Sequence, residues 1–581
     1  MYPHMKPSTF FRILTSCSGC AIVYLIIKAR RDNIMKKILS VFLASVIVFS
    51  TMAFTLPFAG ALTANTYYID SLEGDNSNSG NTPEEAWKDL GGFTNESLGA
   101  GDKVLFRSGG TYDCAVTLSG LKGTKDAPFV ISSYGEGDRP ILKTELHEEV
   151  FTFIDCSYIT VSDVQITAPN GGGIWIDTIN EESVGMTIEN VYFFGLPNGK
   201  VTGRDDMSRG AAPARAAVVV KGLPANSRYP VNDLTITGCE VYDSANGFLI
   251  WGSWNDEQNP WCDDDEKDPI YNEGVLISDC YFHEMDAEAV IIGICDGALV
   301  THCRAINTCQ GEGVDENGEI LYFTAAMWFW GSENSTIQYC EIAGQKNIGD
   351  GMTVDFDSGT NNCTYQYIYS HDNQRFVVNN AKDDPQKNNT VRYCLSVNDN
   401  KGRSSIASGN GEDGLKFYNN TIVNCGEFQF YHLSNSLIAN NIIIPMVGEV
   451  INFDIEDEFY GKNTYKNNCY YNTLNPGCDL LSMNTLPAFV GGEGTEAYKL
   501  AVNSPLLGKG MEIDDGVLYD FYGNEITSTN IGCYMGQGEE PEAETENCFI
   551  KFFRMIKNLF DRIMHELKVI ERELKEKLGI E

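Results

Sequence analysis

Basic residues are scarce in this sequence. Only 42 lysine and arginine residues accompany 80 aspartate and glutamate residues among 581, which gives a formal net charge of −38. Nucleic acids and anionic membranes are bound through basic surfaces, so the composition argues against both as partners. A polyanionic substrate is also disfavoured unless calcium bridges it to the protein. An acidic surface of this kind is typical of an exported protein.

Long apolar runs are also few, and the clearest one lies near the start. Met35-Lys36-Lys37 is followed by an apolar stretch from Ile38 to Phe54 and by the small residues Ala59-Gly60-Ala61. This pattern predicts a secretory signal peptide over residues 35–61, with residues 1–34 as a mis-assigned start. A two-helix membrane anchor is the alternative, which the short apolar runs disfavour. We expect a secreted or cell-surface protein.

Helical patterns are rare between residues 146 and 484, where short β-rich runs recur instead. One run type lies at 173–176, 248–251, 290–292, 327–330, 352–355, 376–379 and 428–431. A second type lies at 187–191, 235–239, 276–280, 300–303, 337–340, 391–394, 417–420 and 438–441. Equivalent positions are 26 residues apart from Cys394 to Asn420 and 21 apart from Asn420 to Asn441. A period in the twenties with polar corners predicts a β-solenoid.

With this repeat and its Asn/Asp corners, the sequence resembles the right-handed parallel β-helix proteins of the pectate-lyase-like superfamily. The resemblance covers about residues 67–536. It implies an all-β, right-handed parallel β-helix at 146–484, between an N-terminal cap at 62–145 and a C-terminal cap at 485–536. The superfamily includes lyases, hydrolases, esterases and adhesins, so the fold leaves the reaction open.

The last part of the chain has a different pattern. An acidic linker at 537–547 precedes apolar residues that recur at helical spacing from Phe549 to Leu578. This pattern predicts a separate amphipathic helix over residues 548–581. We expect it to contact an envelope or membrane surface, to pair with another helix, or to pack back on the solenoid.

Cysteines occupy one repeat position rather than a metal-binding motif. The only C-x-x-C pair is Cys17 and Cys20, in the segment assigned to a mis-assigned start, so we predict no metal site from cysteine. Five others share a position that is aliphatic elsewhere in the repeat: Cys239, Cys280, Cys303, Cys340 and Cys394. This position predicts a ladder of buried thiols. Reduced thiols and stacked disulfides both remain open, because secretion favours disulfides but strand spacing makes bridging awkward.

Two carboxylates share the open face of one predicted strand. Strand alternation places Asp355 and Asp357 opposite Met352, Val354 and Phe356. Same-face neighbours lie about 6.6 Å apart between Cα atoms. Close carboxylates push their pKa values apart, which supplies the acid and the base of glycoside hydrolysis. We predict this pair as catalytic. The alternative is that it only binds substrate or calcium.

Aromatic and amide side chains extend this face onto the equivalent strands. The open-face series contains Trp251, Trp328, Trp330, Asn379 and Tyr431, and Glu288 enters an earlier strand as a reserve catalytic candidate. Aromatic rings stack on the C–H faces of sugars, and polar groups bind the hydroxyls. We therefore predict a glycoside hydrolase acting on plant cell-wall or other extracellular polysaccharide. This chemistry requires no cofactor, and calcium is an optional ligand.

A polar corner follows the carboxylate strand. His371 and Asp372 lie beside each other there, and Arg375 follows. Proteins that the sequence resembles often carry a similar Ser-His-Asp-Asn corner. A histidine held in one tautomer by its acidic neighbour is suited to contact substrate, and we predict such contact for these three residues. The alternative is a structural histidine in a turn.

Two other functions fit the same fold. The first is a calcium-dependent polysaccharide lyase, for which Lys221, Arg375 and Lys382 are the available bases. The second is a non-catalytic, glycan-binding or adhesive solenoid. The acidic charge and the tryptophans favour a neutral glycan and hydrolysis over the lyase.

Overall fold

The computed structural model describes most of the solenoid. The described residues are 64–92, 98–146, 148–196, 216–220, 229–254, 269–311, 324–347, 351–381, 386–409, 411–453, 462–473 and 477–542. The predicted signal peptide and the predicted amphipathic helix lie outside these ranges. No helix within them is long and apolar enough to cross a membrane.

Three long parallel sheets make up the described chain, and we call them sheets 1, 2 and 3. Sheet 1 contains β4 (Val116–Ser119), β7 (Phe151–Ile154), β10 (Ile174–Asp177), β14 (Ala216–Val220), β18 (Asn246–Trp251), β24 (Val290–Gly293), β28 (Ala325–Trp330), β31 (Met352–Asp357), β34 (Arg375–Ala381), β38 (Ser404–Gly409), β42 (Phe428–Phe430) and β46 (Ile451–Phe453).

Sheet 2 contains β1 (Thr66–Ile69), β2 (Lys103–Arg107), β5 (Phe129–Tyr134), β8 (Ile159–Ser162), β12 (Thr187–Glu189), β16 (Thr235–Thr237), β22 (Leu276–Ser278), β26 (Leu299–Thr301), β29 (Thr336–Gln338), β32 (Thr364–Gln366), β36 (Thr390–Arg392), β40 (Lys416–Tyr418), β44 (Leu437–Ala439) and β47 (Thr464–Lys466). Sheet 3 contains β3 (Thr111–Asp113), β6 (Ile141–Lys143), β9 (Gln165–Thr167), β13 (Tyr192–Phe194), β17 (Glu240–Tyr242), β23 (Tyr281–His283), β27 (Arg304–Ile306), β30 (Glu341–Ala343), β33 (Tyr369–His371), β37 (Leu395–Val397), β41 (Thr421–Cys425), β45 (Ile442–Pro445) and β48 (Cys469–Tyr470).

Short strands pair at the corners. They are β11 (Ser183–Val184) with β15 (Val231–Asn232), β19 (Ser253–Trp254) with β20 (Pro269–Ile270), β21 (Asn272–Glu273) with β25 (Cys295–Asp296), and β35 (Gln386–Lys387) with β39 (Glu412–Asp413) and β43 (Leu433–Ser434). The helical elements described are single 3₁₀ turns, such as Pro83–Glu85 and Thr495–Tyr498.

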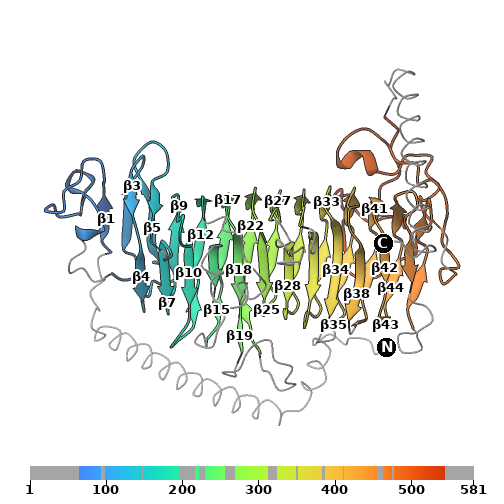
Figure 1. The fold of residues 1–581 in the computed structure, drawn as a ribbon, viewed down its shortest axis with the longest axis horizontal. Helices are drawn as coiled ribbons and strands as arrows, with labels where there is room; N and C mark the ends of the chain where they lie inside the picture. The colour runs from blue at the N-terminus through green and yellow to red at the C-terminus, as the bar shows by residue number, and fades with distance from the viewer. Residues whose placement is uncertain are drawn as a thin grey trace, which may run out of the picture. The chain divides into compact units, whose positions relative to one another are not determined.

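The chain passes through sheets 1, 2 and 3 in order, and each new strand then pairs with the strand of the same sheet from the previous coil. For example, β31, β32 and β33 lead to β34, which pairs in parallel with β31. Figure 1 shows the strands side by side in a row of such turns. This is the arrangement of a parallel β-helix, and right-handed crossovers are the rule for parallel strands. The two predicted run types form sheets 1 and 2. The strands of residues 66–143 already belong to the three sheets.

The inward residues form one continuous apolar core. In sheet 1, Val354 and Phe356 point inward and stack on the corresponding residues of the neighbouring strand, Met327 and Phe329. Phe329 stacks on Tyr365 of sheet 2, and Phe356 packs against the same ring at a tilt. Aromatic and aliphatic side chains from successive turns thus fill the interior.

The predicted thiol ladder lies in this core. All five thiols are at most 2% exposed and free, and each Sγ donates to the carbonyl two residues earlier at 3.2–3.4 Å. Burial raises the pKa of Cys394 to about 12. The structure therefore contains the reduced alternative, with thiols that act as small apolar side chains.

A buried asparagine ladder continues from the thiols. The Oδ1 atom of Asn441 accepts from the backbone N–H and the Nδ2 of Asn420, both at 3.0 Å. Asn441 donates in turn to Asn468 at 2.9 Å, and Asn468 donates to the Asp479 carboxylate at 2.8 Å. Each side chain therefore accepts hydrogen bonds from polar groups at the corner of the neighbouring turn, as buried polar groups require.

Residues 485–542 pack against the last turns. Leu506, Ile531 and Tyr534 contact Ile442 and Cys469. The hydroxyl of Tyr367 donates to the carbonyl of Tyr519 at 2.9 Å. The segment thus covers a corner as well as apolar residues near the last turn, and its role as a closing cap stays a prediction.

Replacing one member of the asparagine ladder should destabilise the protein. Asn441→Ala leaves two donors of Asn420 without an acceptor, so we expect a loss of about 3 kcal/mol in the free energy of unfolding. Chemical denaturation measures it. The control is Asn424→Gly, because Asn424 has a left-handed backbone (φ 56°) and part-exposed surroundings that glycine tolerates. Equal losses in both variants would contradict the ladder's role.

A buried glutamate should make stability depend on pH. Burial raises the pKa of Glu412 to about 8, although the N–H of Asn389 (2.8 Å) and the amide of Asn379 donate to it. Its folded pKa lies above its unfolded value, about 4.3. Its stabilising contribution is therefore full below that value and is lost as the pH rises toward 8.

We expect the urea midpoint of the wild type to fall between pH 5 and pH 8 more steeply than that of Glu412→Gln. Replacement of a half-exposed carboxylate, Glu240→Gln, serves as the control. Parallel pH profiles for the wild type and Glu412→Gln would refute the assignment.

Candidate functional site on sheet 1

The predicted carboxylate pair lies on the outer face of sheet 1. Asp355 alternates with the core residues Val354 and Phe356, and the strand register pairs it with Trp328. Adjacent parallel strands are about 4.8 Å apart, so this tryptophan and this carboxylate are immediate neighbours. Asp355 is 5% exposed, and Asp357, at the end of β31, is partly exposed. The N–H of Ser358 donates to Asp357 Oδ1 at 2.7 Å.

The alternation predicted for β31 fails at its first residues. Met352 packs with Ala325 and Val378 in a small cluster separate from the core, whereas Thr353 is fully buried. Its hydroxyl contacts the hydroxyl of Ser370 at 2.6 Å. The prediction that Met352 shares the inner face was wrong, because a polar network inside the corner holds Thr353 there instead.

The three predicted tryptophans come together on this face. Trp251 packs edge-to-face against Trp328 and Trp330, with ring centroids 6.4 and 5.6 Å apart. Trp251 and Trp330 are 8% and 7% exposed. They join Leu249 and Ile291 in an outer apolar cluster, which places Trp328 as the partly exposed ring nearest to Asp355.

The prediction that Asn379 lies on the open face of sheet 1 was wrong. The register pairs it with the core residue Phe356, and it is 1% exposed. Its Nδ2 donates to Glu412. The residue that follows Asp355 on the outer face is Val378. A register irregularity in β34 between Val378 and Asn380 accompanies this change, which the sequence pattern does not reveal.

The other predicted residues are dispersed. Glu288 precedes β24 and is fully buried, so it presents no carboxylate to the surface in this structure. Arg375 begins β34 and pairs in register with Met352, three residues before Asp355. Tyr431 directly follows β42, the last strand but one of sheet 1, and is partly exposed.

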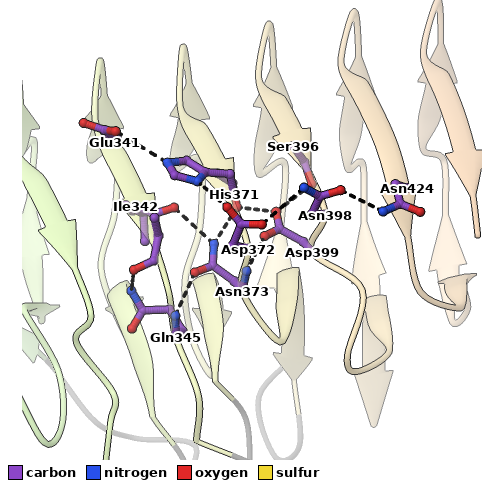
Figure 2. A network of polar contacts seen from close by, with 12 residues as sticks. Glu341, Ile342, Gln345, His371, Asp372, Asn373, Ser396, Asn398, Asp399 and Asn424 are labelled. Carbon is purple, nitrogen blue, oxygen red and sulfur yellow. Dashed lines mark hydrogen bonds and ion pairs between the residues drawn. The ribbon is translucent and has the colours of Figure 1, made fainter. Parts of the chain in front are cut away.

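His371 and Asp372 lie elsewhere. His371 ends β33 of sheet 3, so the structure does not bring it together with the carboxylate pair on sheet 1. Figure 2 shows its ring between Glu341 and Asp372. Its Nε2 lies 3.4 Å from Glu341 Oε1, and its Nδ1 lies 2.9 Å from Asp372 Oδ2. Burial opposes protonation, but the hydrogen bonds to Glu341 and Asp372 outweigh it and raise the pKa of His371.

A buried network beside this histidine was missed by sequence reasoning (Figure 2). The fully buried carboxylate of Asp399 accepts from Ser370, from Ser396 at 2.7 Å and from the N–H of Asn373 at 2.9 Å. Burial raises its pKa. Asn373 also donates to Thr353 at 2.8 Å. The network therefore ties the corner after β33 to the strand that carries Asp355.

No group of metal-ligating side chains is found among the described residues. The acidic loop at 256–268, Lys221 and Lys382 lie outside them, so a calcium ligand set or a lyase base in those positions stays a prediction.

The site and the solenoid define a candidate carbohydrate-active parallel β-helix. No protein-family model matches the chain. A lacto-N-biosidase of Bifidobacterium longum subsp. longum is 26% identical over 521 residues, which cover 74% of this chain and 32% of the relative. The chain thus spans about a third of the length of that relative. The predicted likeness to β-helix glycoside hydrolases is confirmed by this similarity.

Two solved structures are also similar to this chain, at lower identity. The GH136 lacto-N-biosidase of Eubacterium ramulus is 18% identical with a TM-score of 0.45, and the match covers 68% of this chain and 67% of that one. A pectate lyase is 13% identical with a TM-score of 0.39, over 83% of this chain and 98% of the other.

The ion pair of His371 can be tested directly. Hydrogen bonds from His371 and Arg304 lower the pKa of Glu341 to about 2. We expect Glu341→Gln to lower the pKa of His371 in an NMR titration, while the signal of His283, which pairs with Glu240 at 3.0 Å, stays unchanged. The ion pair between His371 and Glu341 stabilises the fold fully at pH values below the pKa of the unfolded histidine. This stabilisation is lost as the pH rises through the pKa of His371 in the folded protein. An unchanged His371 pKa would contradict the pairing.

Proposed function

We propose that this protein is a glycoside hydrolase whose active site is the outer face of sheet 1. The observation that carries the proposal is the register that sets Asp355 beside Trp328, with Asp357 two residues further on the same strand. An aromatic ring next to a pair of carboxylates suits a sugar ring next to its scissile bond.

The proposed mechanism divides the roles between the two carboxyl groups. One donates a proton to the glycosidic oxygen, and the other attacks the anomeric carbon or activates a water. Trp328 stacks on a sugar ring, and the buried Trp251 and Trp330 hold it in place. The network around Asp399 fixes the start of β31 through Thr353.

The proposed substrate is an extracellular glycan. The name of the 26%-identical relative suggests glycans that carry lacto-N-biose, and the acidic charge favours a neutral chain. Plant cell-wall polysaccharide is the second group to test. No cofactor is required, and calcium is an optional ligand.

We further propose that residues 35–61 direct export, so that the protein is secreted or cell-surface associated, and that residues 548–581 contact the envelope. Unchanged retention on cells after deletion of 548–581 would contradict the second part.

The reaction class can be read from the products. The full chain is incubated with oligosaccharides that carry lacto-N-biose and with plant polysaccharides, each with and without a chelator. We expect it to release reducing ends from one of these two groups in both conditions, with no new ultraviolet absorbance. Absorbance that the chelator abolishes would indicate a calcium-dependent lyase. Binding without either signal would indicate an adhesive solenoid.

Neutral replacements test the carboxylate pair. We expect Asp355→Asn and Asp357→Asn each to lower kcat by at least about 10²-fold, because general acid–base catalysis contributes about 10²–10⁴-fold, while binding of the glycan is retained. The control is Asp279→Asn, at a left-handed corner (φ 55°) after sheet 2 that asparagine also accepts. Turnover that persists in both site variants would refute the assignment.

A further inference from the structure

The outer face of sheet 1 changes character at Asp355. On one side of it, the residues in register are apolar: Trp328, Ile291, Leu249 and Val219. On the other side, Val378 is followed in register by Ser405, Gln429 and Asn452. The candidate carboxylate thus stands where an aromatic and aliphatic face meets a hydroxyl and amide face. Both belong to one continuous sheet surface.

The polar half is organised around Glu427. Its Oε1 accepts from Gln429 Nε2 at 2.9 Å and from Asn452 Nδ2 at 2.6 Å, and its Oε2 accepts from Arg403 Nε at 3.1 Å. The hydroxyl of Ser405 donates to Gln429 Oε1 at 3.3 Å. The side chains of Glu427 and Arg403 are 27% and 57% exposed, so both reach the solvent. The carboxylate is therefore held in a fixed orientation and is still accessible.

We propose that Glu427, together with Arg403 and Asn452, is a binding subsite for sugar units of the same glycan beyond those held at Trp328 and Asp355. This inference rests on the proposed function. A fixed carboxylate accepts hydrogen bonds from two neighbouring sugar hydroxyls, and the guanidinium and amide bind ring and hydroxyl oxygens. Because Arg403 neutralises Glu427, the subsite fits a neutral polyhydroxylated chain better than a polyanion.

The position of the subsite sets the length of the substrate. Three strand steps, from β31 through β34 and β38 to β42, separate Asp355 from Gln429. At about 4.8 Å a step this is about 14 Å, which is more than one sugar ring. The enzyme then recognises an oligosaccharide that lies along the solenoid axis, rather than only the unit next to the cleaved bond.

Chain-length dependence tests the subsite. The full chain and its Glu427→Gln variant are compared on an oligomer series of the glycan cleaved in the panel above, from the shortest oligomer turned over to the longest available. We expect kcat/KM of the wild type to rise with length. Glu427→Gln should lose about tenfold or more on the longest oligomers and change little on the shortest, since hydrogen bonds to charged groups contribute about 1.5–3 kcal/mol. The control is Glu240→Gln on sheet 3, whose carboxylate is also partly exposed and ion-paired.

The outcomes separate the subsite from the reaction. Cleavage with the same length profile in the wild type and Glu427→Gln overturns the subsite alone, as does an equal loss on short and long oligomers. A glycan that binds without being cleaved overturns the hydrolase, and calorimetry of its binding to wild type and Glu427→Gln then tests the subsite by itself. Unchanged melting temperatures confirm that the variants fold.

Discussion

The fixed register between successive turns is the constraint on which the rest of the structure depends. Corner side chains such as Asn420, Asn441 and Asn468 are buried, and their amides hydrogen-bond across turns. Each also donates to a backbone carbonyl of the preceding turn. An unsatisfied buried polar group costs about 1–3 kcal/mol, so a turn that slipped by one residue would lose several such bonds at once. The same register that stacks the core also fixes the columns on the outer faces, and this is what makes Trp328 a neighbour of Asp355.

The fixed register also explains how a repetitive scaffold can carry a local site. The inner position of sheet 1 stays apolar at most turns, because every turn must fill the same interior. The outer position is free of that demand and changes from Leu249 and Ile291 through Asp355 to Gln429. Solenoid stability is close to a sum over turns and their neighbours. Chemistry placed on an outer column therefore disturbs the core little, and a glycan lying along the axis meets one turn after another.

The sequence predicts what the repeat determines and fails where the repeat is interrupted. The period, the two strand types, the inward thiols and the outward Asp355 all follow from alternation and spacing. Asn379 was assigned to the wrong face because a local shift in β34 and a partner 33 residues away, Glu412, turn it inward. Met352 and Thr353 exchange faces for a similar reason. The corner motif around His371 does not reveal which sheet carries it, since a β-helix sends residues that follow one another to different sheets.

Buried carboxyl groups show why position must be known before a role is given. Asp399 and Glu412 are fully buried, and burial raises the pKa of both, a feature often found in catalytic acids. Yet Asp399 accepts from Ser370, Ser396 and Asn373 inside a corner, and Glu412 continues a ladder of amides. Neither lies in the outer column of sheet 1. Asp355 differs because it does lie there, and its register partner on that face is the partly exposed Trp328. In this fold, the register partner of a carboxylate distinguishes a candidate catalytic acid from a structural one better than its burial does.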